Sequence, residues 1–131
     1  MKYLTIEEIL FIHHRILVEL QPDNSDFNIL IQHALLSAIS RPKRTVFGRD
    51  AFESIYSKAA ALTEAIIKTH PFQDGNKRVG IVAGIVFMKN NGFEITARND
   101  DVFHAAHNLS IDFWSFEDIK EWFENFFNYN N

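Results

Sequence analysis

Apolar residues recur with a helical period over most of this chain. Thr5 and Glu8 have capping-box spacing, and a stripe of apolar residues follows: Ile6, Ile9, Leu10, Ile16, Leu17 and Leu20. Turn-forming residues predict a loop at 21–26, and a second helix is expected over 27–40. This helix should end near Arg41, because the proline that follows disfavours helical backbone in the residue before it.

The centre of the chain predicts two long helices separated by a short turn. Asp50 with Glu53 offers a cap for the first helix, which should continue to about Thr69 and end before the proline at position 71. The second helix is expected over 76–91, with Gly92 as a left-handed residue at its end. The run VGIVAGIVFM makes this helix apolar nearly all round, so we place it at the centre of the bundle.

The C-terminal third predicts shorter elements. FEIT at 93–96 predicts an extended piece, and helices are expected over 100–109 and over 115–128, the latter opening with Ser115. The sequence contains no repeat and no low-complexity segment. The pattern therefore predicts an all-α fold, a compact bundle of about six helices that forms a single domain over 1–131.

Composition supports a globular domain. The chain has 131 residues, of which 47% are hydrophobic and 23% are charged. The absence of cysteine excludes disulfides and cysteine nucleophiles. The N-terminus lacks the apolar core of a signal peptide, and the longest apolar run, GIVAGIVFM, is too short to span a bilayer. We therefore expect a cytoplasmic protein without membrane contact. The net charge of −4 argues against broad, charge-driven binding of nucleic acid.

One segment, RPKRTVFGR at 41–49, departs from the overall acidic balance. It carries four cations: Arg41, Lys43, Arg44 and Arg49. One interpretation is a solvated basic loop, and the other is a local attraction for phosphates.

HPFQDGNKR at 70–78 concentrates chemistry-bearing residues in the turn between the two central helices. Free backbone N–H groups and the helix dipole make a helix start attractive to anions, above all phosphates. Gly75 allows a ligand to approach the backbone closely, and Asn76 can donate from its side-chain amide. Lys77 and Arg78 add two cations beside the same turn.

His70 and Asp74 complete the set. Histidine changes charge near neutral pH, so His70 could take a proton from an attacking hydroxyl. One carboxylate such as Asp74, together with phosphate oxygens, is the usual way in which Mg²⁺ is held. These residues compose a phosphoryl- or nucleotidyl-transfer site. The alternative is a plain turn with Phe72 in the core, although Lys77-Arg78 reverse the usual preference for acids in a first helical turn.

The stretch resembles the motif of the Fic/Doc family, H-x-F-x-[D/E]-G-N-[G/K]-R. Seven residues match it without a gap: His70, Phe72, Asp74, Gly75, Asn76, Lys77 and Arg78. The segments ALLSAISRPK and YSKAAALTEAIIKTHPF before it, and NGFEI after it, resemble the Doc-type (death-on-curing) toxins over about residues 4–127. The resemblance implies an all-α fold and a nucleotide-dependent transferase that modifies hydroxyl side chains of target proteins.

The resemblance also implies a role for each matching residue. These roles are His70 as the general base, Asp74 as the Mg²⁺ ligand, Gly75 and Asn76 as the anion hole, Lys77 and Arg78 as phosphate contacts, and Phe72 as a structural anchor. The basic segment lies where the family has a short flap that aligns the target. Arg41, Arg44 and Arg49 are therefore candidates for substrate or phosphate contact, with a plain surface role as the alternative.

Two positions depart from the pattern of the family's AMP transferases. Lys77 replaces a glycine, and Ile81 replaces a second arginine. Doc-type members share the lysine, and the resemblance then implies that the γ-phosphate of ATP, or of another NTP, faces the acceptor. The first hypothesis is a protein kinase acting on Ser or Thr, and AMP transfer is the second. A binding module that performs no chemistry is the third.

The same resemblance also implies how the transferase is inhibited and which protein it modifies. Many Fic proteins carry an inhibitory helix, [ST]-x-x-x-E-[GN], whereas here Glu124-Asn125 is preceded four positions earlier by Lys120. We therefore expect a toxin restrained by a separate antitoxin, whose C-terminal helix would lie in an apolar groove. The resemblance suggests elongation factor Tu as the target, with a block of translation. His104 and His107 have i, i+3 spacing but no third ligand nearby, so a helix-surface role is favoured over metal binding.

Overall fold

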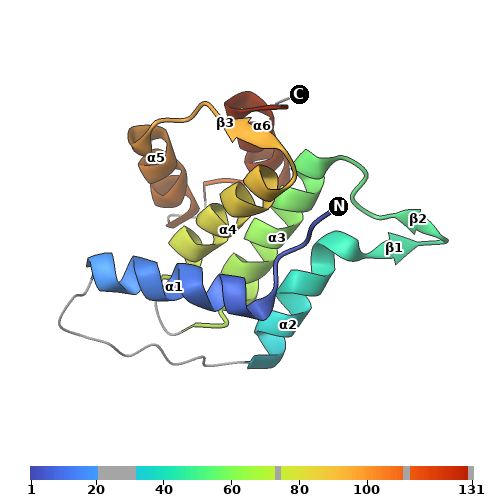
Figure 1. Ribbon diagram of the computed structural model, residues 1–131, viewed down its shortest axis with the longest axis horizontal. Coiled ribbons are helices and arrows are strands. Elements are labelled where there is room, and N and C mark those ends of the chain that lie inside the picture. The colour runs from blue at the N-terminus through green and yellow to red at the C-terminus, as the bar shows by residue number, and fades with distance from the viewer. Residues whose placement is uncertain (21–31, 73–74, 111–112, 130–131) are drawn as a thin grey trace.

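Six α-helices make up most of the chain that the structure describes (Figure 1). The structure, a computed structural model, describes residues 1–20, 32–72, 75–110 and 113–129. The helices are α1 (Ile6–Leu20), α2 (Gln32–Ser40), α3 (Ile55–Thr69), α4 (Asn76–Asn90), α5 (Asn99–Ser110) and α6 (Phe116–Phe126). The shorter elements are a 3₁₀ turn, η1 (Arg41–Lys43), and four strands, β1 (Thr45–Val46), β2 (Arg49–Asp50), β3 (Phe93–Ile95) and β4 (Phe127–Tyr129). The expected all-α bundle is confirmed.

Helix α4 occupies the centre of the bundle. It contacts α1, α3, α5 and β3, and Figure 1 shows it between α3 and α5. Val79, Ile81 and Phe87 of this helix are fully buried. This position explains why the helix is apolar nearly all round, and it confirms the prediction that α4 is central.

Helices α3 and α4 approach each other closely at two glycines. The Thr63 hydroxyl on α3 donates a hydrogen bond of 2.8 Å to the carbonyl oxygen of Gly80 on α4. One turn later, a Cβ atom on Gly84 would lie 2.4 Å from Cζ of Phe123 and 2.6 Å from Oγ1 of Thr63. Such distances leave no room for a side chain, so Gly84 permits α3, α4 and α6 to meet at one point.

The structure confirms two predicted helix starts and corrects a third. Thr5 and Ser115 cap α1 and α6 through reciprocal capping boxes. The N-cap of α3 is Ser54, which pairs with Ser57, and the predicted cap at Asp50 and Glu53 is wrong. Asp50 lies instead in β2, where it is paired with Thr45 in a hairpin, so the helix begins later.

Of three other predicted helix ends, two are confirmed and one is wrong. The end of α2 at Ser40, before Pro42, and the left-handed Gly92 (φ 89°) after α4 are as predicted. The last helix is shorter than predicted, because residues Phe127–Tyr129 pair with β3 in an antiparallel ladder, with Phe127 opposite Ile95. The predicted loop at 21–26, and the first part of the predicted helix 27–40, lie outside the described residues.

No helix in the described ranges is long and apolar enough to cross a membrane.

Candidate active site

His70 ends α3 in a backbone conformation that residues other than glycine rarely adopt. Its φ of 47° and ψ of 59° are left-handed, which costs an L-residue about 1–2 kcal/mol. Strained backbone of this kind is concentrated at functional sites. The side chain of His70 is exposed although most of α3 before it is buried. The turn therefore presents an accessible imidazole at the end of a core helix.

The N-terminus of α4 follows at Gly75. This residue is the N-cap, with φ 80° and ψ 9°, and it has no side chain to cap the helix. A Cβ atom there would lie 3.7 Å from Leu17, an ordinary contact, so the positive φ and not the space requires glycine. The first turn of α4 has no acidic residue and carries Lys77 and Arg78. Backbone N–H groups and the helix dipole therefore favour an anion at this point, and two cations lie on the same helical turn.

Asn76 closes the motif turn with its side chain. Its amide Nδ2 donates to the Phe72 carbonyl at 2.8 Å, and its Oδ1 accepts from the Phe72 N–H at 3.1 Å. Asn76 is 8% exposed, so both bonds are shielded from water. The role of Asn76 as a donor to an anion stays a prediction. Its two hydrogen bonds to the Phe72 backbone are a structural role that the sequence did not indicate.

Phe72 is fixed from the opposite side by a histidine of α1. The rings of Phe72 and His13 are nearly parallel, 10° apart in plane, with centroids separated by 3.8 Å. Phe72 is 1% exposed and His13 is 2% exposed. The sequence did not indicate this contact, but the position of His13 between Ile9 and Ile16 on the apolar stripe of α1 was the available signal.

Lys77 connects the motif to the end of α5. Its Nζ donates a hydrogen bond of 2.8 Å to the carbonyl oxygen of Ser110, the last residue of α5. Carbonyl groups at a helix C-terminus attract cations, so this contact is electrostatically favourable. The sequence did not predict that α5 would border the motif, because the two segments are far apart along the chain.

Arg78 lies between two hollows. The first, of about 580 Å³, separates it from α5 and is lined by Arg78, Asn99, Asp100, Val102, Phe103 and Ala106. The second, of about 290 Å³ and largely apolar, runs along α1 and α4 and is lined by Phe11, Ile12, Arg15, Ile16, Arg78, Val82 and Val86. The motif thus borders one hollow of ligand size and one apolar groove.

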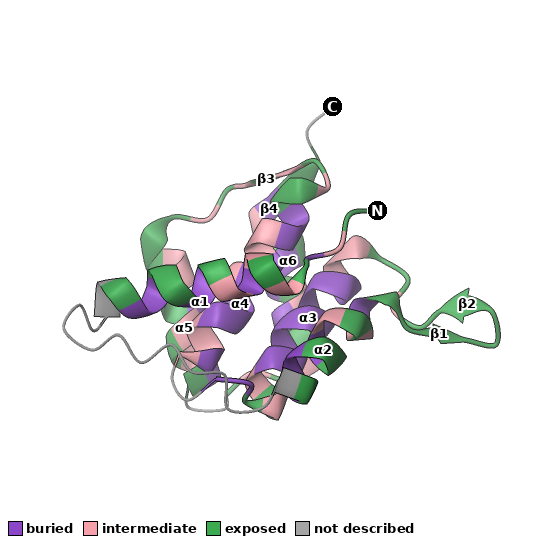
Figure 2. Ribbon diagram, turned by 60° about the horizontal axis from the view of Figure 1, so that its bottom comes forward, coloured by how far each residue is buried: buried purple, intermediate pink, exposed green. Residues whose placement is uncertain are grey.

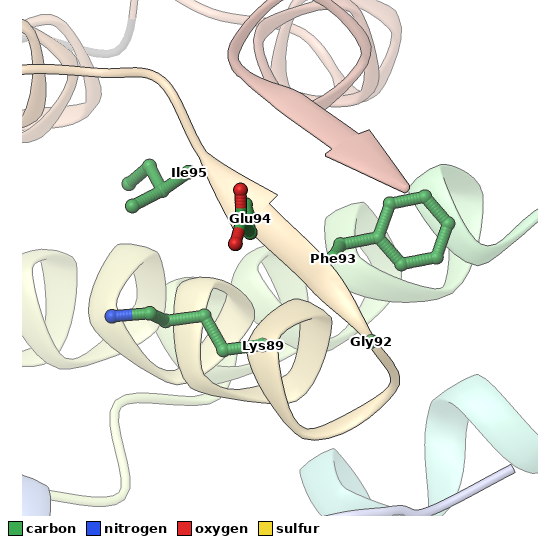
Figure 3. A pocket seen from close by; sticks show the side chains of 5 residues that line it. All are labelled: Lys89, Gly92, Phe93, Glu94 and Ile95. Atoms are coloured by element: carbon green, nitrogen blue, oxygen red, sulfur yellow. The ribbon is translucent and has the colours of Figure 1, made fainter. Parts of the chain in front are cut away.

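A further hollow, of about 430 Å³, is remote from the motif (Figure 3). It is formed by Lys89 at the end of α4 and by residues 92–95, which include β3. Because α4 has 15 residues and rises about 1.5 Å per residue, this hollow lies roughly 20 Å from the helix start. It is therefore not part of the candidate site.

The expected flap before the motif is an exposed hairpin. Strands β1 and β2 pair antiparallel and project from the body of the molecule (Figures 1 and 2). Phe47 (φ 51°) and Gly48 (φ 79°) form its two-residue turn. Two left-handed residues suit the turn to the twist of the strands. The Phe47 side chain is fully exposed at the tip.

Ionic contacts with two buried residues of α3 anchor the base of this hairpin. Lys58 on α3, which is 3% exposed, donates to the Phe52 carbonyl at 2.6 Å and pairs with Asp50 at 3.2 Å. Arg41 pairs with Glu64 at 2.8 Å and lies over the ring of Phe52. Of the three flap candidates, Arg41 is therefore engaged at the base. The other two, Arg44 and Arg49, lie on the exposed hairpin.

The predicted metal ligand, Asp74, lies outside the described residues. Within the ranges that are described, no three His, Asp or Glu side chains lie close enough together to hold a metal ion. The described groups at the start of α4 include backbone N–H groups, the Lys77 ammonium and the Arg78 guanidinium, which suit an anion and not a cation. In this motif a Mg²⁺ ion would therefore depend on the Asp74 carboxylate and on phosphate oxygens.

Comparison with known proteins agrees with this arrangement. The family model described as Fic/DOC family matches residues 3–88, which is more than half of the chain. A curated protein named Toxin Doc, from Mycolicibacterium smegmatis, is 39% identical over 64 residues. That match spans 49% of this chain and 49% of the relative, so it covers about half of the relative's length. The resemblance stated from the motif is confirmed, and the chain belongs to the Fic/DOC family.

Proposed function

We propose that this chain is the toxin of a toxin–antitoxin pair, and that it transfers the γ-phosphate of ATP, or of another NTP, to a Ser or Thr hydroxyl of a target protein. One observation carries the proposal: an accessible histidine, His70, borders a helix start that holds Lys77 and Arg78 and no acidic residue. We propose that the reaction occurs in the cytoplasm, with elongation factor Tu as the target and with a block of translation as the result.

The proposed reaction places each motif residue in a chemical role. His70 takes the proton of the acceptor hydroxyl as its oxygen bonds to the γ-phosphorus. The bond from that phosphorus to the bridging oxygen breaks, and the electron pair leaves with the nucleoside diphosphate. The N–H groups at the start of α4, with Lys77 and Arg78, stabilise the negative charge of the transferred group. Mg²⁺ held by Asp74 would neutralise phosphate charge when bound.

The hollow beside α5 can accommodate the nucleoside. Its volume of about 580 Å³ lies within the usual range for small-molecule sites. Phe103, which is 65% exposed, offers an aromatic face to a base, and Asp100 offers acceptors to hydroxyl or amino groups. Because Arg78 lines the same hollow, phosphates that reach the helix start would be continuous with a nucleoside against α5.

The position of Lys77 favours the kinase reaction over AMP transfer. Its side chain extends from the first turn of α4 to the end of α5, where Ser110 accepts its hydrogen bond. A glycine in its place would leave that space empty and uncharged. A long cation here changes both the room and the charge of the phosphate cradle, which supports a nucleotide pose different from that of the AMP transferases.

Labelled ATP distinguishes the two reactions. We expect label at the γ-phosphate, and not label at the α-phosphate, to enter elongation factor Tu when both proteins are incubated with Mg²⁺. The same incubation with bacterial extract detects other targets. Label that enters from the α-phosphate would establish AMP transfer instead. Absence of transfer from both positions, to the factor and to the extract, would favour a binding module without chemistry.

The groove between α1 and α4 supports the antitoxin as a partner. It is largely apolar, and Phe11, 64% exposed, stands at its edge. An amphipathic helix placed in such a groove would bury this apolar surface. Because Arg78 lines the groove, an occupant would contact the phosphate-binding turn and so restrain transfer. We propose this groove as the site of the antitoxin's C-terminal helix.

A growth assay tests the proposed pairing of this chain with an antitoxin. Expression of the chain in a bacterium is expected to stop growth, and co-expression of the protein encoded by the adjacent gene is expected to restore it. Val82→Glu places a charge in the groove on a partly exposed residue, so this variant should stay toxic while escaping the restoring protein. Equal rescue of the variant and the wild type would exclude the groove as the binding site.

A further inference from the structure

We infer that His13 is a positioning residue for the motif turn, and that it acts through Phe72. His13 lies on α1, far along the chain from the motif, and it is not one of the motif positions. The part of the inference that concerns activity rests on the proposed transfer reaction. The part that concerns the geometry of the turn does not.

Helix α1 packs against Phe72 and Gly75 of the motif. Side chains of Ile16 and Leu17 are the nearest atoms to a Cβ built on Gly75, at 3.8 and 3.7 Å. His13 precedes these residues by one helical turn, on the same buried stripe, and lies against Phe72. Phe72 and Gly75 therefore both pack against α1, on side chains that are one helical turn apart.

The ring of His13 determines where Phe72 can lie. At a centroid distance of 3.8 Å and an interplanar angle of 10°, the two rings face each other at van der Waals contact. An aliphatic side chain is thicker than a flat ring, so it would displace Phe72 or leave a gap in this close-packed core. The contact with Phe72 therefore favours a planar side chain at position 13.

Displacement of Phe72 would reach the phosphate-binding turn through two hydrogen bonds. The N–H and the carbonyl of Phe72 both pair with the side chain of Asn76, the first residue of α4. Asn76 also contributes one of the N–H groups of the helix start. The path from His13 to the anion site thus passes through one ring contact and one paired side chain. Misplacement of a reacting group by about 1 Å can lower a rate about 100-fold.

The experiment compares two substitutions at position 13 with a control on the same helix. His13→Phe keeps a flat ring, and His13→Leu keeps an apolar side chain but loses planarity. Ile9→Ala removes fully buried volume from α1 one turn away from His13, and so lowers stability while the His13 ring itself is kept. If His13→Leu does not fold, His13→Gln replaces it as the non-planar variant.

Two readouts are taken on each variant. The first is kcat and KM for γ-phosphate transfer from ATP to elongation factor Tu. We expect His13→Leu to lower kcat about 10- to 100-fold with little change in KM for the target, and His13→Phe to retain most of kcat. The second is hydrogen exchange of the Phe72 and Val79 amides, which donate to Asn76 and to the Gly75 carbonyl.

Hydrogen exchange tests the role of His13 even if the protein transfers no phosphate. We expect exchange of these two amides to become about ten-fold faster in His13→Leu, relative to amides in the middle of α6, and to stay near the wild-type rate in His13→Phe. If His13→Leu changes both amides no more than Ile9→Ala does, His13 is an ordinary core residue and the inference is overturned. If the wild type itself transfers no γ-phosphate, the proposed function fails, while exchange still decides the role of His13.

Discussion

His70→Ala is expected to lower the transfer rate by a factor of about 10²–10⁴ while the fold stays intact. The loss follows from removal of the group proposed to take the proton of the acceptor hydroxyl. The fold should persist because the side chain is exposed, and because alanine carries the same strain as histidine at a φ of 47°. The measurement is single-turnover transfer of γ-label, with thermal unfolding recorded on the same protein.

Two companion variants sharpen this test. His70→Gly should lose transfer equally, but it should unfold at a higher temperature than His70→Ala, because glycine adopts the left-handed conformation without strain. His33→Ala removes an exposed histidine on α2 and should leave transfer unchanged. A rate for His70→Ala within ten-fold of the wild type would show that His70 is not the base. Glycine and alanine variants of equal stability would show that the backbone strain is small.

Gly84→Ala is expected to destabilise the protein by about 1–3 kcal/mol, the usual cost of overpacking. Alanine is intrinsically the better helix former by about 1 kcal/mol, so helix propensity alone predicts the opposite sign. The steric conflict dominates because the added Cβ would lie 2.4 Å from Cζ of Phe123, a ring that is fully buried. The Phe123 ring, the Thr63 side chain or the helices that carry them must shift to relieve the overlap. The measurement is urea unfolding of the variant beside the wild type.

Gly80→Ala is the matched control on the same helix. Its added Cβ would lie 3.0 Å from the Thr63 carbonyl oxygen and 3.1 Å from Ile67, which is tight but less severe. Its helix-propensity gain should offset much of the conflict, so its stability should lie nearer to that of the wild type. Combination of Gly84→Ala with Phe123→Leu should cost less than the sum of the two single substitutions, because the leucine removes the ring atom in conflict. A stability of Gly84→Ala equal to the wild type would contradict the close packing seen here.

Local spacing was sufficient for much of the fold. The capping boxes at Thr5 and Ser115, the central apolar helix and the left-handed Gly92 all depend on residues within a few positions of one another. The failed predictions involve pairing with distant segments. Asp50 has the spacing of a cap but belongs to a hairpin, and Phe127 continues a helical pattern but pairs with Ile95.

The sequence by itself determined the helical class, the break between the two central helices and the types of residue that this break carries, because residue type and short-range spacing specify all three. Only the tertiary structure decided what surrounds the turn. It placed His13 beneath Phe72, the end of α5 beside Lys77, and Arg78 between a ligand-sized hollow and an apolar groove. Such contacts join residues far apart along the chain, and their geometry is set by how the helices pack and not by any local pattern.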